Sequence, residues 1–199
     1  MLVGFESLNE ASLSALGKVQ NQSSGKLRQT LPATERQLAT YETLVRRVYD
    51  HGLMIYATFV LGYDHDGPET FGELLDFATR MRFTVANFNP LIPMPDTELY
   101  RRLEREGRLL KPAWWVDPDY HYGETTFLPR GMTPQELEDG CFRLRQAFYS
   151  HRNISQRFRQ NRLHHKPLNA FVYQVANQVS RLEIKRKQGQ LLARTGHSR

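Results

Sequence analysis

The chain has 199 residues, of which 40% are hydrophobic and 24% charged, the composition of one soluble globular domain with a small appendage. No stretch reaches the roughly 18–20 consecutive apolar residues of a membrane span. Met1–Glu6 lacks the basic and long apolar regions of a secretory signal. The single cysteine, Cys141, excludes an internal disulfide, a cysteine-rich zinc site and a self-contained iron–sulfur cluster. We therefore expect a cytoplasmic protein.

Three short segments have the composition of strands, and helical patterns separate them. The apolar runs typical of buried parallel strands are Met1–Glu6, Leu53–Leu61 and Thr84–Leu91. The spacing of apolar residues predicts helices over residues 34–50, 68–82 and 96–107, the last capped by Asp96. Alternating strands and helices indicate right-handed βαβ units, and therefore a parallel sheet or barrel.

The C-terminal part has a different pattern. Residues 109–130 are irregular and rich in aromatic side chains, and one long helix is predicted from Thr133 to Phe158. After a break at His164–Pro167, residues 168–187 form a second, basic helix, and the final dozen residues are predicted to be disordered.

Glycines stand where predicted strands end, which is where ligands bind in α/β proteins. Gly4–Ser7 and Leu61–Asp64 both combine a glycine, which admits a ligand close to the backbone, with a carboxylate suited to a ribose diol. The alternative is that Gly4 and Gly62 only begin turns. Asn89–Pro95 could flank a flat heteroaromatic ring, or it is a proline-rich turn shaped by packing.

Several other side chains leave two interpretations open. Asp64–Asp66, with His65 between the carboxylates, is a metal site or, more simply, a solvated turn. His164–His165 is expected to be a surface pair, and Cys141 a core residue. The aromatic side chains either line a substrate entrance or pack across the open side of a barrel; they are Trp114, Trp115, Tyr120 and Tyr122.

The net charge of +6 is concentrated at the C-terminal end. Residues 151–199 hold 11 of the 27 lysines and arginines but only one acidic residue, Glu183. This region has an electrostatic footprint suited to phosphate, and its cations include Arg157, Arg159, Arg162, Lys166, Arg181, Lys185, Arg186 and Lys187. Phe171, Val175, Val179 and Leu182 recur at helical spacing, which predicts an amphipathic helix. That helix either docks on the body of the protein or lies on an anionic membrane surface, with nucleic acid the less favoured ligand.

A set of motifs comes in an order and spacing typical of one enzyme family. The first are Val3–Ser7, Phe59–Asp64 with Pro68–Phe71, and Pro90–Tyr100. Those that follow are Leu103–Arg108, Tyr122–Gly123, Phe127–Pro129, Met132–Leu137 and Phe148–Ser150. In these motifs the chain resembles the C-terminal half of radical S-adenosylmethionine enzymes, and most closely of those linked to a cobalamin-binding domain. Asp96 stands where the family has a glycine, so a tight left-handed turn is not expected there.

The resemblance implies an α/β fold, the C-terminal half of a partial (β/α)6 barrel. Residues 1–108 would supply about three parallel strands, residues 109–160 would close the barrel, and residues 161–199 would form a basic helical tail. S-adenosylmethionine would bind at the strand ends, with Glu6 accepting a ribose hydroxyl. The cofactor-binding residues that the resemblance implies are Gly4, Glu6, Ser7, Phe59, Gly62, Asn89 and Leu91.

The family's activity depends on a C-x3-C-x2-C loop that holds a 4Fe–4S cluster, and this sequence has no such loop. The resemblance therefore implies that the chain is not catalytic alone and that its partner is an N-terminal polypeptide carrying the cluster loop. The parent enzyme would use the cluster, S-adenosylmethionine and cobalamin on a small-molecule substrate that the sequence does not identify. The other hypothesis is a non-catalytic α/β module whose basic tail binds an anionic partner.

Overall fold

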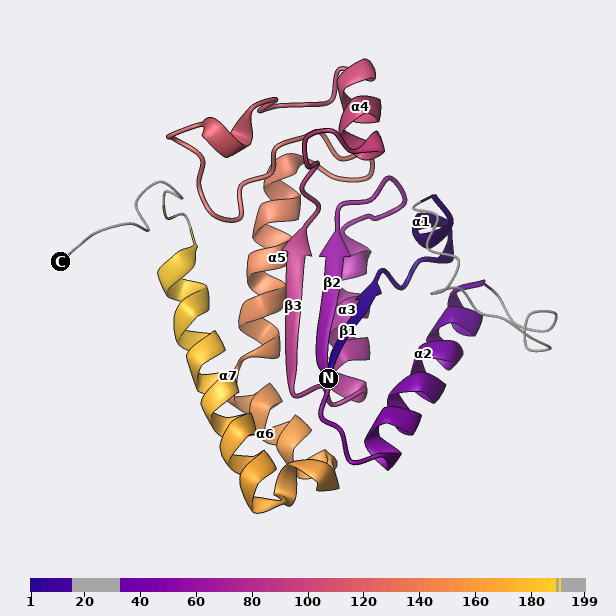
Figure 1. Cartoon of the computed structure of the whole chain (residues 1–199), viewed down its shortest axis with the longest axis vertical. Helices are drawn as coiled ribbons and strands as arrows, with labels where there is room; N and C mark the ends of the chain where they lie inside the picture. The colour runs from indigo at the N-terminus through magenta and orange to yellow at the C-terminus, as the bar shows by residue number, and fades with distance from the viewer. Residues whose placement is uncertain (16–32, 189, 191–199) are drawn as a thin grey trace.

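The computed structural model describes residues 1–15, 33–188 and 190. Within them, β1 (Leu2–Glu6), β2 (Tyr56–Leu61) and β3 (Val85–Pro90) form one parallel sheet in the order β1-β2-β3 (Figure 1). The predicted α/β class with three parallel strands is confirmed. The predicted disorder of the final dozen residues falls almost wholly outside the described residues.

Helices connect the strands and cover one face of the sheet. After α1 (Glu10–Ala15), α2 (Ala33–Asp50) leads to β2, and α3 (Glu69–Arg80) leads from β2 to β3. The rings of Phe5, Phe59 and Phe88, one from each strand, stack in a row with centroids 5.4 Å apart. Side chains of α2, α3 and α5 (Pro134–Phe148) pack on this row, because alternate residues of each strand point toward them.

The C-terminal half is mostly helical. It contains α4 (Glu98–Arg105), α5 (Pro134–Phe148), α6 (His151–Gln160) and α7 (Pro167–Lys187), with short 3-10 turns at Trp114–Val116 and Arg162–His165. The long helix predicted from Thr133 to Phe158 is wrong. The chain breaks at Tyr149–Ser150, where the Ser150 hydroxyl accepts a hydrogen bond from the Asn153 amide and begins α6.

Two expectations about the start of α4 are also wrong. Asp96 adopts the left-handed conformation, with φ of 66°, although it replaces a glycine of the family pattern. Aspartate is one of the few non-glycine residues that tolerate this region. The cap of α4 is the next residue, Thr97, whose hydroxyl accepts from the Tyr100 amide at 3.2 Å.

Side chains of the C-terminal helices pair with the outer edge of β3. The Tyr149 hydroxyl bonds to both the amide (3.1 Å) and the carbonyl (3.0 Å) of Ala86. Asn177 donates to the Thr84 carbonyl at 3.0 Å, and Arg157 donates to the Phe83 carbonyl at 2.6 Å. Side chains therefore occupy the backbone groups of Ala86 that a further strand would need, and also the carbonyls of the two residues before β3.

Two predicted surface residues are buried at this edge. Arg157, counted among the phosphate-binding cations, is inaccessible to solvent and lies 3.7 Å from the Phe148 ring. His164, predicted as half of a surface pair, is also fully buried, with Nε2 3.1 Å from the Thr84 hydroxyl. For Arg157, hydrogen bonds to backbone carbonyls and neutral side chains replace the water that the guanidinium would have bound.

The predicted basic helix is present as α7, which lies beside α5 and α6 (Figure 1). No helix among the described residues is both long and apolar enough to cross a bilayer. Along α7 several apolar side chains remain exposed, namely Leu168, Phe171, Val172, Val175, Val179 and Leu182.

Candidate functional site

The second face of the sheet carries small and polar side chains. We call it the open face, and its residues are Gly4, Tyr56, Thr58, Val60, Asn87 and Asn89. Gly4, Thr58 and Asn87 are directly paired across the three strands, and Val60 pairs with Asn89 one step toward the carboxyl end. All six are exposed or only partly buried, and those in β2 and β3 are flanked by buried residues along each strand.

Glu6 lies over the first strand of this face. The pairing of β1 with β2 shifts between Gly4 and Glu6, and Glu6 itself has a left-handed φ of 64°. Its carboxylate folds back over Gly4, so that a Cβ at Gly4 would lie only 3.0 Å from Oε1 and 3.7 Å from the Thr58 hydroxyl. Glycine at position 4 therefore leaves the room that a carboxylate needs to lie along the strand.

The other predicted residues at the end of β1 and within β2 do not reach the open face. Ser7 is buried, its hydroxyl accepts from the Asn9 amide at 3.0 Å, and its carbonyl accepts from the Tyr41 hydroxyl. Phe59 is fully buried among the aromatic rings on the helix-covered face. The structure thus brings Gly4, Glu6 and Asn89 to one face of the sheet and buries Ser7 and Phe59 away from that face.

Gly62 has a structural role in the turn after β2. Its φ is 102°, and a Cβ there would lie 2.6 Å from Leu137 of α5, so both conformation and packing require glycine. The amides of Gly62 and Tyr63 donate to one carboxylate oxygen of Asp66, at 2.9 and 3.0 Å. This geometry favours the interpretation of Gly62 as a turn residue.

Asp64 and Asp66 have separate roles in the same turn. Asp66 is buried, which raises the pKa of its carboxyl group although the two amide hydrogen bonds oppose the shift. Asp64 instead forms ion pairs with Arg102 (3.1 Å) and Arg108 (2.9 Å). Because Asp66 is buried, the solvated-turn interpretation holds for only part of this segment. Within the described residues, no group of three or more His, Cys, Asp or Glu side chains could hold a metal ion.

Leu91 and the aromatic segment lie beyond the end of β3. The Leu91 amide extends the sheet by donating to the Leu61 carbonyl at 2.7 Å. Trp114 donates to the Pro93 carbonyl at 3.1 Å and packs on Tyr120, with ring centroids 5.2 Å apart. Trp114 and Tyr120 therefore pack over the strand end, whereas Tyr122 lines a pocket.

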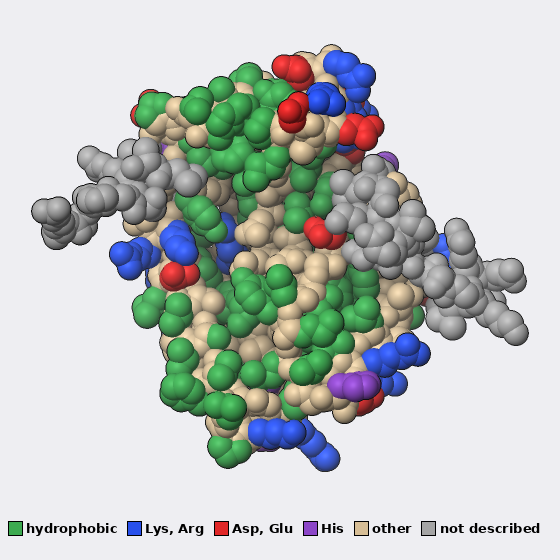
Figure 2. All heavy atoms as spheres, in the orientation of Figure 1, with side chains coloured by type: hydrophobic (Ala, Val, Ile, Leu, Met, Phe, Trp, Pro, Cys, Tyr) green, Lys and Arg blue, Asp and Glu red, His purple; other side chains and the backbone are tan. Residues whose placement is uncertain are grey.

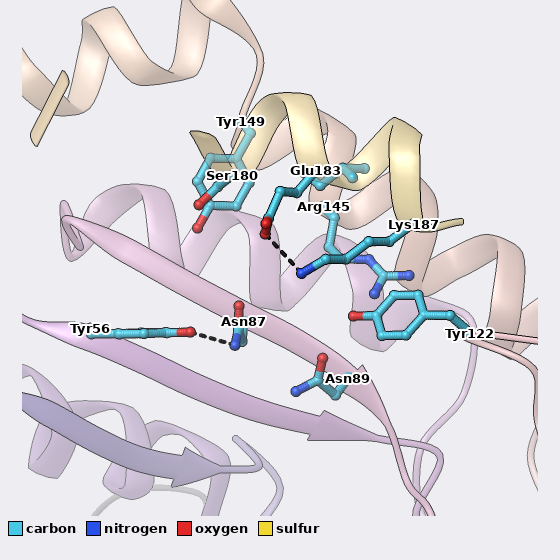
Figure 3. Close-up of a pocket in the computed structure, with 10 residues that line it drawn as sticks. Tyr56, Asn87, Asn89, Tyr122, Arg145, Tyr149, Ser180, Glu183 and Lys187 are labelled. Atoms are coloured by element: carbon cyan, nitrogen blue, oxygen red, sulfur yellow. Dashed lines mark hydrogen bonds and ion pairs between the residues drawn. The ribbon is translucent and has the colours of Figure 1, made fainter. Parts of the chain in front are cut away.

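This pocket, of about 220 Å³, lies between β3 and α7 (Figure 3). The sequence did not indicate that most of the residues lining this pocket belong to a site. It also did not indicate a role for Thr58 or Asn87 of the open face. The available signal was the polar residues Thr58, Asn87 and Asn89 at alternate positions of otherwise apolar strands, which mark one face. The lining residues are Tyr56, Asn87, Asn89, Tyr122, Arg145, Tyr149, Ser180, Glu183, Ile184 and Lys187.

The described residues do not fit an iron–sulfur cluster. Cys141, the one cysteine of the sequence, is buried on α5, and burial raises the pKa of its thiol to about 12. A cluster needs several thiolates, which a single buried thiol cannot provide.

Comparisons with known proteins agree with the motifs. The family model described as "Domain of unknown function (DUF4070)" matches residues 97–195. The chain is similar to the bacteriochlorophyllide d C-12(1)-methyltransferase of Chlorobaculum tepidum, with 27% identity over 169 residues, 85% of this chain and 32% of the relative. It is also similar to the hopanoid C-2 methylase of Rhodopseudomonas palustris, with 36% identity over 66 residues, 33% of this chain and 12% of the relative.

The chain spans about a third of the length of the first relative and about an eighth of the second. The family model spans α4, α5, α6 and α7. These matches confirm the resemblance of the chain to the C-terminal half of cobalamin-linked radical S-adenosylmethionine enzymes.

Proposed function

We propose that this chain is the part of a radical S-adenosylmethionine methylase that contributes one side of the nucleoside site and a wall of the substrate site. The observation that carries the proposal is the Glu6 carboxylate lying over Gly4 on the open face. A carboxylate held along a glycine backbone is suited to accept hydrogen bonds from the two hydroxyls of a ribose. Both relatives are named for methyl transfer, which supports the reaction class.

In this proposal the predicted residues have different roles. Gly4 and Glu6 would receive the ribose, while Asn89 and the backbone near Leu91 would border the adenine. Ser7, Phe59 and Gly62 would act indirectly, by fixing the turn after β1, the spacing of the strands and the turn after β2. S-adenosylmethionine supplies the reactive group when a cluster is present, and cobalamin would serve the parent enzyme.

The chain alone is expected to be inactive, because its one cysteine cannot hold the cluster. Its partner would be a polypeptide that carries the C-x3-C-x2-C loop. The proposal therefore predicts binding of the nucleoside by this chain, and catalysis only by the assembled protein.

Equilibrium dialysis with S-adenosylhomocysteine tests the binding. Wild-type protein should bind it saturably with a dissociation constant on the order of 1 mM, as expected of a site of which only one side is present. Gly4→Val, which fills the space under Glu6, should weaken binding by about tenfold or more. The matched control is Gly72→Ala, at an exposed helical position where a Cβ meets nothing within 4 Å.

Glu6→Gln provides a second variant that preserves the shape of the site. Loss of the carboxylate should also weaken binding about tenfold, since hydrogen bonds to a charged acceptor contribute about 1.5–3 kcal/mol. Saturable binding that neither Gly4→Val nor Glu6→Gln changes would contradict the proposal, as would no binding by the wild-type protein.

A second candidate function is contact with an anionic membrane surface through α7. The exposed apolar side chains of Phe171 (67%) and Leu182 (73%) favour it, because they lie on the same helix as the cations Lys185 and Arg186. Sedimentation with vesicles containing anionic lipid should then fall steeply as salt is raised. Nucleoside binding at the open face should barely respond to the same change in salt.

A further inference from the structure

A polar pocket at the β3 edge of the open face has no assigned ligand. Figure 3 shows Asn87 and Asn89 of β3 on one side, Ser180, Glu183 and Lys187 of α7 on the other, and Arg145 with Tyr122 closing one end. We call it the β3–α7 pocket. Its walls come from both the sheet and the C-terminal helices, so the pocket forms only when these two parts pack together.

Arg145 is a buried cation without an acidic partner. Only 8% of the residue is exposed, and its Nε makes no hydrogen bond. One Nη donates to the Gln188 side chain at 3.2 Å, and the guanidinium lies 5.8 Å from the centre of the Tyr122 ring. Among the acidic side chains that the structure describes, none forms an ion pair with Arg145. Burying such a charge is unfavourable unless an anion compensates it.

The second cation of the pocket is already paired. Lys187 lies 3.0 Å from Glu183, and about half of each side chain is exposed. The charges of Arg145, Lys187 and Glu183 therefore leave the pocket with one net positive charge. A carboxylate, which is planar and singly charged, matches that charge and the fork of the guanidinium. A phosphate dianion would exceed the charge of the pocket by one and would be repelled more strongly by Glu183.

The size and position of the pocket limit the ligand further. A volume of about 220 Å³ holds a short carboxylate-bearing arm rather than a whole drug-sized ligand, whose sites span about 300–1,000 Å³. Asn89 lines this pocket and also belongs to the open face. The rest of a molecule anchored here would therefore lie over the open face, next to the proposed nucleoside site. Two reactants must be held close together in this way in order to react.

We infer that the β3–α7 pocket binds a carboxylate of the methyl acceptor, with Arg145 as its charge partner. The identification of the ligand as the methyl acceptor rests on the proposed function, but the preference for a carboxylate rests on the pocket alone. The inference gives this chain a role in selecting the substrate: acceptors that bear an acidic side arm are preferred over neutral ones.

An NMR titration of the full chain with butyrate tests the inference, with the Nε–Hε signal of Arg145 as reporter. Butyrate should shift this signal saturably, and butyramide, its neutral isostere, should not. Inorganic phosphate should bind at least about threefold more weakly than butyrate. Equal binding of butyrate and butyramide would overturn the inference, and so would tighter binding of phosphate.

Two variants and a matched control locate the effect. Arg145→Gln should weaken butyrate binding about tenfold, monitored by the Tyr122 amide, whereas Arg143→Gln should leave it unchanged. Arg143 lies on the same helix but is exposed, and it lies 4.0 Å from Asp139. If Arg145→Gln does not fold, Asn89→Asp replaces it, since a negative charge on the pocket wall should weaken binding by about fivefold. An equal loss in Arg143→Gln, or no loss in either pocket variant, would contradict the inference.

The same samples separate this inference from the proposed function. If S-adenosylhomocysteine binds and butyrate does not, the carboxylate pocket is wrong and the nucleoside site stands. If butyrate binds to the Arg145 pocket and S-adenosylhomocysteine does not bind, the pocket stands as a carboxylate site and the methylase proposal fails.

Discussion

The two faces of the sheet use the same strands for different purposes. On the helix-covered face, Phe5, Phe59 and Phe88 are fully buried and stack on one another. On the open face, Gly4, Thr58 and Asn87 occupy the equivalent row and leave space above the backbone. Large side chains on one face supply the stability that small polar side chains on the other do not. In Figure 2, which views the molecule from the side of the open face, hydrophobic side chains gather above the sheet and most charged side chains lie toward the periphery.

The first prediction compares neighbouring residues that point to opposite faces of β2. Phe59→Ala should lower the free energy of unfolding by about 3–5 kcal/mol, because it leaves a cavity among four aromatic rings. Val60→Ala, on the partly exposed open face, should cost less than about 1 kcal/mol. Urea denaturation measures both values. Similar losses in the two variants would show that the open face also belongs to the core.

The second prediction concerns Arg157, which donates one hydrogen bond within α6, to Asn153, and four others to the segment before β3, to α5 and to α7. Arg157→Met should cost about 3 kcal/mol, because it leaves the carbonyls of Phe83 and Thr84 without this donor in a buried position. Arg159→Met, an exposed position two residues further along α6, is the control and should have little effect. Equal unfolding midpoints for the two variants would contradict a structural role for Arg157.

The third prediction is a pH dependence that arises from His164. Burial lowers the pKa of this imidazole from 6.5 to about 4. In the unfolded chain His164 takes up a proton below pH 6.5, whereas in the folded chain it remains neutral until about pH 4. The contribution of His164 to folding stability should therefore be fully present above pH 6.5 and be lost between pH 6.5 and 4, by about 3 kcal/mol in total.

A comparison of the wild type with His164→Gln isolates this contribution from that of the other titrating groups. The variant should be less stable at pH 7.5, and its stability should fall less steeply between pH 6.5 and 4. Parallel stability curves for the two proteins over this range would refute the assignment.

The smallest effect is expected at the outer edge of β3. Tyr149→Phe removes the hydroxyl that bonds to both backbone groups of Ala86 and should cost about 1–2 kcal/mol. Hydrogen exchange of the Ala86 amide should rise with little change at Phe88. Tyr100→Phe, whose hydroxyl donates to the Pro112 carbonyl on the exterior, serves as the control. Unchanged exchange at Ala86 would show that Tyr149 does not protect the edge.

The sequence predicts the strands well, because their apolar runs and the helices between them are local patterns. It does not show which face of β2 the helices leave uncovered. Leu53–Leu61 looks like a strand buried on both sides, and only Thr58, with Asn87 and Asn89 of β3, indicates an open face.

Long-range contacts explain what the sequence patterns missed. Arg157 and His164 resemble surface cations in a basic region, yet their partners Phe83 and Thr84 lie more than 70 residues earlier in the chain. The position of Arg145 in the wall of the β3–α7 pocket likewise depends on how α5 packs beside α7. By contrast, the break before α6 carries a local signal, the capping residue Ser150, which the continuous apolar periodicity obscured.

The central claim is that the open face, and not the basic helix, binds the nucleoside. The most direct test is a two-dimensional amide NMR titration of the full chain with S-adenosylhomocysteine at two salt concentrations. We predict saturable shifts at Gly4, Glu6 and Leu91 that are the same at both salt concentrations, with no shift along α7. Shifts confined to α7, or shifts that vanish at high salt, would contradict the account.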